Sequence, residues 1–199
     1  DVTSTPVWVS YDVTSIAVAG TNNLHIVGAM WATNQTAGGA AVAFPAAAAW
    51  VAAPVPLAVG ANTIAVYGTN AFGVAAWDSV VITRGPAGTG TPFTDVTNDA
   101  AWVTYDVTSY AVAGTNNANV VGTMFVSNAT VGGVRLAFAA SASWSAPAVA
   151  LAIGANTLRV YGSNAFGVVV DDSVVITRGP AGTGVPFVDV TNAATWVNY

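Results

Sequence analysis

The chain repeats itself every 94 residues, and this repeat restricts its fold more than any other feature of the sequence. The stretch Gly60–Gly73 recurs at Gly154–Gly167 with three substitutions, an offset of 94 positions (154 − 60 = 94). The run Asp78–Gly90 returns unchanged at Asp172–Gly184. A repeat of this length is one folding unit used again. We therefore expect two domains, over residues 1–85 and 86–179.

A third copy begins near the end of the sequence. Residues 180–199 are predicted to hold a linker and the first strand of this incomplete repeat, because Trp196 follows Trp102 at the same offset of 94. The linker at 85–90 recurs at 179–184, which predicts that successive junctions repeat their geometry. The terminal strand either continues covalently into a further repeat, the simpler arrangement, or pairs with a neighbouring sheet.

The local pattern predicts an all-β fold, with tandem immunoglobulin-like β-sandwich domains. Short runs of β-branched and aromatic residues are separated by Gly, Asn and Pro, as in sandwiches. In the first copy, strands are expected at Val7–Val13, Ile16–Ala19, Ile26–Thr33, Ala40–Phe44, Val55–Ala58, Thr63–Gly68 and Val80–Arg84.

Differences between the copies indicate which side chains face water. Ala41 and Ala65 of the first copy are replaced by Arg135 and Arg159 in the second, so these positions are expected to be exposed. Because side chains alternate along a strand, their neighbours should face the core: Ala40/Val134, Val42/Leu136, Phe44/Phe138, Ile64/Leu158 and Val66/Val160.

The same alternation directs Tyr67 and Tyr161 outward. Each ring either lies over a neighbouring strand or contacts another chain, and the second alternative makes both tyrosines candidates for self-association.

The charge pattern excludes several kinds of partner. The chain has four Arg, nine Asp and a net charge of −5, with 7 % charged residues. Without a basic cluster, nucleic acid and anionic membranes are not expected partners. A surface with little charge repulsion suits a protein that packs against other copies of itself and against neighbouring repeats, or one that is coated with sugar.

One apolar stretch resembles a membrane span but is predicted to be strand and turn. The segment Ala40–Ala61 lacks charged side chains and is long enough to span a bilayer. Its copy carries Arg135 and several serines, and Pro45 and Pro54 would break a helix. No membrane insertion is expected.

A set of positions that both copies share resembles a known family. The set comprises Trp50, Leu57, Gly60, Asn62, Thr63, Val66, Gly73 and Asp78–Arg84, with Val18-Ala-Gly20 upstream. It resembles the bacterial immunoglobulin-like repeats appended to glucodextranase and found in very long surface proteins, over Val13–Arg84 and Val107–Arg178. The resemblance implies extracellular display, a spacer, adhesive or structural role, and no catalysis. It also implies that Asn62 holds a turn and that Trp50 packs on the core.

Few residues are suited to chemistry. His25 is the single histidine and there is no cysteine, so neither a zinc site nor a Ser-His-Asp triad can be assembled within this sequence. We predict no enzyme activity and no cofactor. Asp12 and its copy Asp106 are the candidates for a Ca²⁺ site, although no dense acidic loop accompanies them.

Two further motifs recur in both copies. Asn34-Gln-Thr36 and Asn128-Ala-Thr130 are sequons, which makes Asn34 and Asn128 candidate glycosylation sites. Trp8, Trp102 and Trp196 each precede a tyrosine by three positions. We expect structural packing of these indoles; self-association and stacking on glycans are the alternatives.

The sequence therefore predicts a structural extracellular protein, a repeat unit of a cell-surface fibre, stalk or filament. In such a protein each repeat buries a small core, and low-charge surfaces associate laterally. The alternative is a carbohydrate-binding or adhesive module attached to a secreted enzyme or adhesin.

Overall fold

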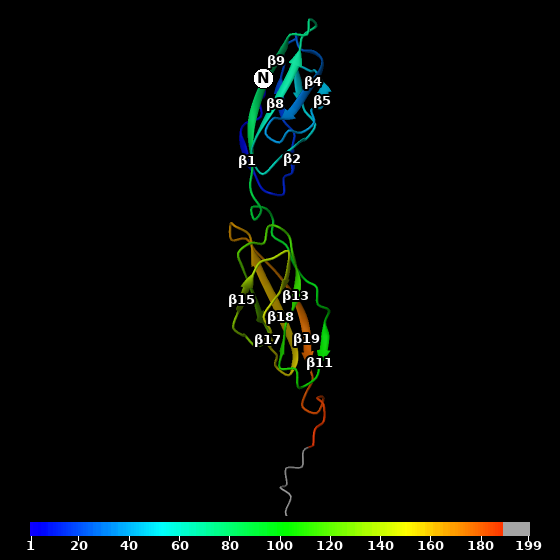
Figure 1. The fold of residues 1–199 in the computed structure, drawn as a ribbon, viewed down its shortest axis with the longest axis vertical. Coiled ribbons are helices and arrows are strands. Elements are labelled where there is room, and N and C mark those ends of the chain that lie inside the picture. Colours follow the sequence, from blue (N-terminus) through cyan, green and yellow to red (C-terminus); the bar gives the residue numbers. More distant parts are fainter. Residues whose placement is uncertain (189–199) are drawn as a thin grey trace, which may run out of the picture. The chain divides into compact units, whose positions relative to one another are not determined.

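The computed structural model describes residues 1–188, and all regular structure in this range is β-strand. The chain folds as two units (Figure 1). Unit 1 comprises Asp1–Phe93 with the short segments Asn117–Val121 and Ser163–Val169. Among the described residues, unit 2 comprises Thr94–Asn116, Gly122–Gly162 and residues 170–188. The linker at 85–90 thus belongs with the repeat that precedes it. The predicted strand of the third copy, including Trp196, lies outside the described residues.

The first repeat forms nine strands in two layers. They are β1 (Val7–Val9), β2 (Ser15–Ile16), β3 (Ala19–Thr21), β4 (Val27–Asn34), β5 (Val42–Pro45), β6 (Ala49–Val51), β7 (Val55–Pro56), β8 (Gly60–Thr69) and β9 (Ala75–Arg84). One layer is a five-stranded sheet in the order β1-β9-β8-β4-β5 (Figure 1), with β1 parallel to β9 and the other pairs antiparallel. The other layer is built from the antiparallel pairs β2-β7 and β3-β6.

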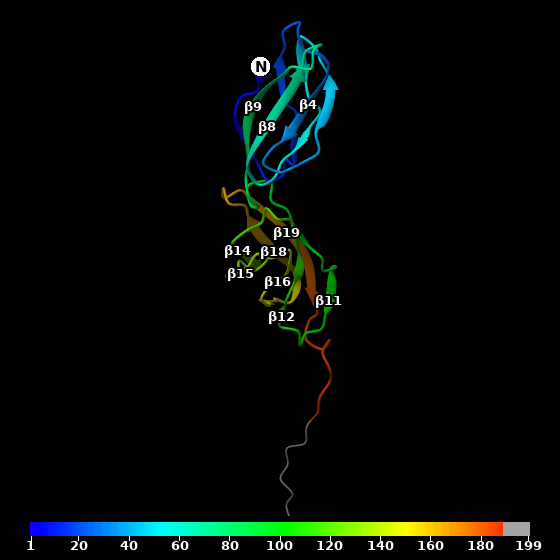
Figure 2. The same cartoon turned by 45° about the horizontal axis from the view of Figure 1, so that its top comes forward.

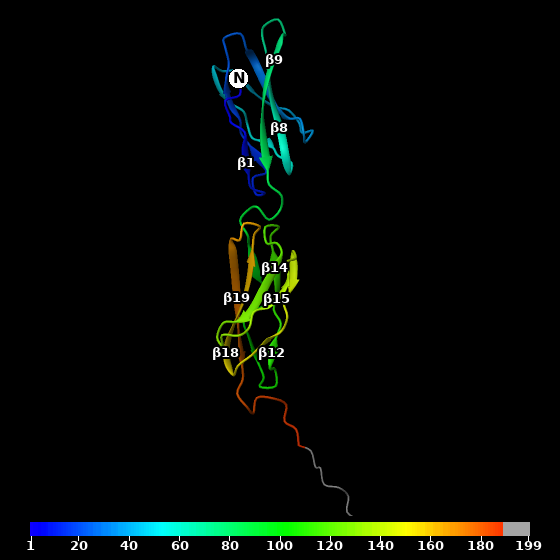
Figure 3. The same cartoon turned by 90° about the vertical axis from the view of Figure 1, so that its left-hand side faces the viewer.

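The second repeat reproduces this arrangement. Its strands are β10 (Thr94–Val96), β11 (Ala101–Val103), β12 (Ser109–Tyr110), β13 (Ala113–Asn116), β14 (Thr123–Asn128), β15 (Leu136–Ala139), β16 (Ser143–Ser145), β17 (Val149–Ala150), β18 (Gly154–Ser163) and β19 (Val169–Arg178). The large sheet has the order β11-β19-β18-β14-β15 (Figure 2), and β10-β13-β16 with β12-β17 form the second layer. Figure 3 shows β14, β15, β18 and β19 from another side. This strand order is that of an immunoglobulin-like sandwich, with the first strand divided between the two layers.

The core of each repeat lies between the layers. In the first repeat it includes Val18, Met30, Trp50, Ile64 and Ile82, each at most 5 % exposed. The predicted core residues Phe44, Ile64 and Val66 are confirmed, as are Leu158 and Val160 in the second repeat. Apolar side chains that alternate along β8 and β18 therefore specify the inner face of the sheet.

A pair of buried asparagines connects the strands at one end of this core. The Nδ2 amide of Asn34 donates to Oδ1 of Asn62 at 2.7 Å and to the Pro56 carbonyl at 2.9 Å. Asn62 in turn donates to the carbonyl oxygens of Ala58, Gly60 and Ile82. Gly60, at φ 97°, occupies the turn that Asn62 holds. Asn128 and Asn156 form the same pair in the second repeat. The expected turn-holding role of Asn62 is thus observed directly.

Several sequence expectations differ from the structure for local reasons. Val134 was expected in the core but is 80 % exposed, because the hairpin loop extends to Arg135 and β15 begins only at Leu136. Ala40 is exposed for the same reason, since β5 begins at Val42. Ala65, expected in water, is 0 % exposed. Its position in β8 alternates with the core residues Ile64 and Val66, so it lies on the outer face of the sheet between Thr33 of β4 and Ser79 of β9.

The linker after each repeat packs back on that repeat. Thr89 Oγ1 accepts a hydrogen bond from the Tyr11 amide at 3.1 Å and donates to the Pro86 carbonyl at 2.7 Å. Gly85 lies under the indole of Trp8, and a Cβ built on Gly85 would be 2.5 Å from Trp8 Cζ2. Thr183 and Tyr105 repeat the first contact in unit 2. Each linker is therefore a folded extension of its own repeat.

Candidate interaction surface

The outer face of the large sheet in unit 1 carries a row of aromatic side chains. Trp31 of β4 is paired in register with Tyr67 of β8, and Tyr67 is paired with Trp77 of β9. Trp77 is 63 % exposed and Trp31 is 38 % exposed. Side chains in one register row project from the same face of a sheet. Three neighbouring strands thus present Trp31, Tyr67 and Trp77 together, and we call these residues the aromatic face.

Hydrogen bonding and stacking hold Tyr67 in this row. Its ring centroid lies 6.3 Å from that of Trp77, with 30° between the ring planes. The Gln35 side chain donates a 2.6 Å hydrogen bond to the Tyr67 hydroxyl. The remaining outward positions of β8 and β9 carry only Ala, Thr, Ser and Val side chains. The aromatic face is therefore surrounded on these strands by uncharged residues.

The matching face of unit 2 has a different character. Trp77 is replaced by Asp171 and Ala65 by Arg159, and these two side chains form an ion pair with Nη2 and Oδ2 2.6 Å apart. The hydrogen bond that Nε of Arg159 donates to Asp171 at 2.7 Å, followed by the negative charge of Asp171, raises the pKa of Arg159 above its usual value. The guanidinium of Arg135 lies 4.5 Å from the centroid of the Tyr161 ring, and that of Arg159 lies 5.4 Å away.

We call Phe125, Arg135, Arg159 and Tyr161 the arginine face. Phe125 and Tyr161 are paired in register, as Trp31 and Tyr67 are in unit 1. Tyr67 and Tyr161 therefore occupy equivalent positions, but arginine covers only the second ring.

Sequence reasoning identified Tyr67 and Tyr161 but not the tryptophan neighbours of Tyr67. Trp77 lies three positions before Val80, which is buried with Ile82 on the inner side of β9. Because side chains alternate along a strand, a residue three positions from Val80 projects from the opposite face. This spacing indicates that Trp77 faces outward. The expected strand began at Val80 and so left Trp77 outside the alternation.

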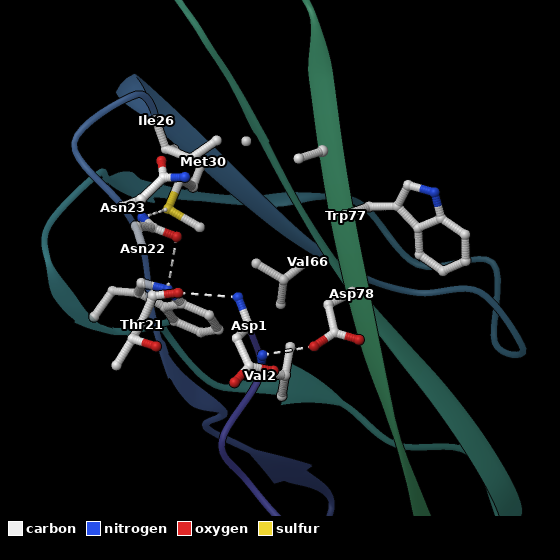
Figure 4. Close-up of a pocket in the computed structure, with 13 residues that line it drawn as sticks. Asp1, Val2, Thr21, Asn22, Asn23, Ile26, Met30, Val66, Trp77 and Asp78 are labelled. Atoms are coloured by element: carbon white, nitrogen blue, oxygen red, sulfur yellow. Dashed lines mark hydrogen bonds between the residues drawn. The ribbon is translucent and has the colours of Figure 1, made fainter.

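A cavity of ≈ 440 Å³ opens beside the N-terminal segment of unit 1 (Figure 4). Asp1, Thr21, Met30, Trp50 and Val66 are among its lining residues. The N-terminal ammonium donates to the Thr21 carbonyl at 2.9 Å.

The carboxylate of Asp78 at this cavity is already engaged. It accepts hydrogen bonds from the amides of Val2 at 2.8 Å and Ser79 at 2.8 Å, and these bonds lower the pKa of Asp78. The N-terminal ammonium and the Asp78 carboxylate at this cavity are thus both paired within the protein.

The sequon asparagines lie inside the fold. Asn34 and Asn128 are each 0 % exposed, and Nδ2 of each donates two hydrogen bonds to groups of its own repeat. The sequon threonines are also engaged, since Thr36 Oγ1 accepts from the Thr63 amide and Thr130 Oγ1 from the Thr157 amide. Because a glycan is attached through Nδ2, its attachment would require each asparagine to leave these buried hydrogen bonds. Both residues of each sequon also have a structural role in the folded repeat.

The candidate calcium ligands contact the linkers. Oδ2 of Asp12 accepts a hydrogen bond from the Thr91 amide at 2.8 Å, and Oδ2 of Asp106 accepts one from the Val185 amide at 3.0 Å. Among residues 1–188, no group of three or more His, Cys, Asp or Glu side chains is positioned to hold a metal ion. His25 is exposed. These aspartates cap the linker turn in both repeats.

The tryptophan–tyrosine motif packs against the linkers. Trp8 and Trp102 lie over Gly85 and Gly179 while remaining 49 % and 58 % exposed. The guanidinium of Arg84 lies 4.8 Å from the Tyr11 ring centroid, and Arg178 lies at the same distance from Tyr105.

The part of the chain that the structure describes contains no helix long and apolar enough to cross a membrane.

Comparison with known proteins finds similar solved structures at low sequence identity. No protein-family model matches the chain, and no curated protein matches it. Among solved structures, the fibronectin(III)-like modules of Clostridium thermocellum CbhA share 13 % identity over 96 % of this chain and 99 % of theirs, with a TM-score of 0.38.

Two further similar structures are those of a titin fragment and of Sidekick-1. Titin A168169 shares 10 % identity over 88 % of this chain and 95 % of its own, with a TM-score of 0.43. Immunoglobulin domains 1–4 of Sidekick-1 share 8 % identity over 90 % of this chain and 48 % of theirs, with a TM-score of 0.45. At such values the assignment of an immunoglobulin-like fold depends on the strand order and register of the two repeats.

Proposed function

We propose that the chain is part of an extracellular structural protein, a repeat unit of a cell-surface fibre, stalk or filament whose sandwich surfaces self-associate. One observation carries this proposal: the outer face of β4, β8 and β9 bears exposed tryptophan and no charged side chain. Outer faces of antiparallel sheets are ordinarily polar. A broad uncharged face with exposed aromatic rings is suited to burial against protein.

The repeat supports the structural part of the proposal. Both copies use the same strand order, the same buried asparagine pair and the same folded linker. In arrays of this kind, stability is the sum of the repeats and of their nearest-neighbour interfaces. The resemblance of the sequence to glucodextranase-type bacterial repeats supports the extracellular location.

Sedimentation velocity over a range of protein concentrations tests the proposal. We expect the weight-average sedimentation coefficient of the purified chain to rise with concentration, and electron microscopy to show laterally associated particles. A single monomeric species up to the solubility limit, with only separate strings in micrographs, would contradict self-association.

The aromatic face also favours one alternative, a carbohydrate-binding or adhesive module. Trp31 and Trp77 are exposed beside a tyrosine hydroxyl and the Gln35 amide, and such a row can stack on sugar rings. Pull-down with insoluble polysaccharides tests this alternative. It predicts retention that is lost in Trp77→Asp, whereas loss in Trp102→Ala would instead assign sugar contact to the linker tryptophans.

A further inference from the structure

We infer that the aromatic face of unit 1 docks on the arginine face of unit 2 in a second copy of this chain. The inference rests on the proposed function, because it assumes that copies associate, and it specifies which surfaces meet. Tyr67 and Trp77 would receive the Arg135 guanidinium of the other copy.

The substitutions between the repeats support unlike partners for the two faces. By register and sequence offset, Ala41, Ala65 and Trp77 of the first repeat correspond to Arg135, Arg159 and Asp171 of the second. Two of the substituted residues, Arg159 and Asp171, form one ion pair in unit 2, so these two substitutions depend on each other. The aromatic face lacks cations, while the arginine face supplies them. Cations are attracted to the faces of Trp and Tyr rings, which makes the two surfaces complementary.

Unit 2 itself shows what binds a tyrosine at this position. Arg135 and Arg159 both lie over Tyr161, whereas alanines stand at the matching positions beside Tyr67. A guanidinium is planar and can stack on aromatic rings with both of its faces. Arg135 can therefore keep Tyr161 on one side and accept Trp77 of a second copy on the other.

Arg135 is also the arginine that remains available. Arg84 and Arg178 donate to the carbonyl oxygens of Tyr11 and Tyr105 within their own repeats. Arg159 is paired with Asp171. Within the described residues, no carboxylate lies at ion-pair distance from Arg135, and it follows an exposed hairpin loop before β15.

The size of the face fits a weak, reversible contact. The strands β8 and β9 have ten residues and β4 has eight, so the three strands that carry the aromatic face are about 33 Å long and about 14 Å wide, giving roughly 450 Å² per partner. Standard interfaces bury about 800 Å² per partner, and smaller ones belong to transient complexes. Assembly would then require the many contacts of a repetitive chain.

The contact joins two different surfaces, and each chain carries one aromatic face and one arginine face. This arrangement provides a direct test with two variants, each of which uses the residue that the other repeat has at the same position. Trp77→Asp removes the aromatic face and Arg135→Ala removes the available cation, and the opposite repeat shows that the fold accommodates both residues. Phe72→Asp is the matched control, because Phe72 is 93 % exposed and lies outside both faces.

We expect Trp77→Asp and Arg135→Ala each to weaken self-association in sedimentation velocity by about three- to thirty-fold, as for loss of one cation–π contact. Phe72→Asp should associate like the unchanged chain. An equimolar mixture of the two variants should form one-to-one dimers more readily than either variant alone, because it restores one intact pair of faces.

Other outcomes would overturn the inference in distinguishable ways. If the unchanged chain associates and the two variants associate equally well, the contact is not formed by these two faces, although self-association itself is supported. If Phe72→Asp weakens association as much, the contact is general apolar adhesion. If the unchanged chain stays monomeric, the proposed function fails as well, and retention on insoluble chitin or cellulose that depends on Trp77 would assign the aromatic face to a polysaccharide.

Discussion

Asn62 connects several strands of the first repeat through a single amide group. It accepts hydrogen bonds from Asn34 and from the Ala58 amide, and it donates to three carbonyl oxygens. The two side-chain amides are removed from water together, since Asn34 and Asn62 are 0 % exposed. A buried polar group without a partner costs more than a satisfied bond contributes, so the network acts as a unit.

Replacing Asn62 with alanine should destabilise the first repeat by about 2–4 kcal/mol, because several buried partners lose their bonds at once. Urea unfolding followed by tryptophan fluorescence measures this change. Asn23→Ala is a suitable comparison, since Asn23 is exposed and accepts one local bond from His25. A loss no larger than that of the comparison variant would show that water replaces the network.

Asp78 should make the first repeat sensitive to acid. Hydrogen bonds from the Val2 and Ser79 amides lower its pKa in the folded protein. The contribution to stability is therefore present above the unfolded value of about 4 and is lost as the pH falls through the folded value.

Asp78→Asn should flatten the dependence of the melting temperature on pH in this acidic range. Asp99→Asn, at an exposed position, is the control and should leave the slope unchanged. An unaltered acid slope in the Asp78 variant would assign the dependence to other carboxylates.

The strands differ in how far the sequence could specify them. The strands β8 and β18 were predictable because their buried residues alternate with outward residues; the buried ones are Ile64, Val66, Leu158 and Val160. The strand β6 was missed, since its alanine-rich surroundings conceal the pairing of Trp50 with Gly20 across two short strands. That pairing depends on long-range contact rather than on local preference.

The surface could be predicted only in part for the same reason. Alternation identified Tyr67 as outward, but the ion pair of Arg159 with Asp171 and the stacking of Trp77 depend on neighbours from other strands. A sequon likewise does not reveal that its asparagine is buried. Local spacing determines the direction of a side chain, whereas its partners follow from the assembled sheet.

Gly85 at the start of the linker should not tolerate a side chain. A Cβ at this position would lie 2.5 Å from both Trp8 Cζ2 and Thr89 Oγ1. We expect Gly85→Ala to destabilise the first repeat by about 1–3 kcal/mol, as other overpacked sites do. Gly39→Ala is the control, because a Cβ there meets nothing within 4 Å.

Chemical denaturation of these variants, and of the double variant Trp8→Ala/Gly85→Ala, measures the effect. The double variant should lose less stability than the sum of the two single changes, since removing the indole relieves the clash. Full additivity would show that the linker is not held under Trp8.

At the scale of the whole molecule, stability should not depend on calcium. Asp12 and Asp106 each accept a linker amide through Oδ2, so binding a cation would compete with bonds already formed. Adding Ca²⁺ after treatment with a chelator should leave the melting temperature unchanged in differential scanning calorimetry. A clear increase that disappears in Asp12→Asn would instead establish a calcium site.

The anchoring of the arginines has a consequence for resistance to proteases. The chain has no lysine and four arginines, so trypsin-like enzymes have four bonds to cleave. Arg84 and Arg178 precede the linkers, where they are paired with Val9 and Val103 in parallel ladders and their side chains are bound to backbone carbonyls. Arg159 lies within β18. Arg135 lies outside a strand beside an exposed loop, and tryptic cleavage should begin there while the linkers between repeats stay intact.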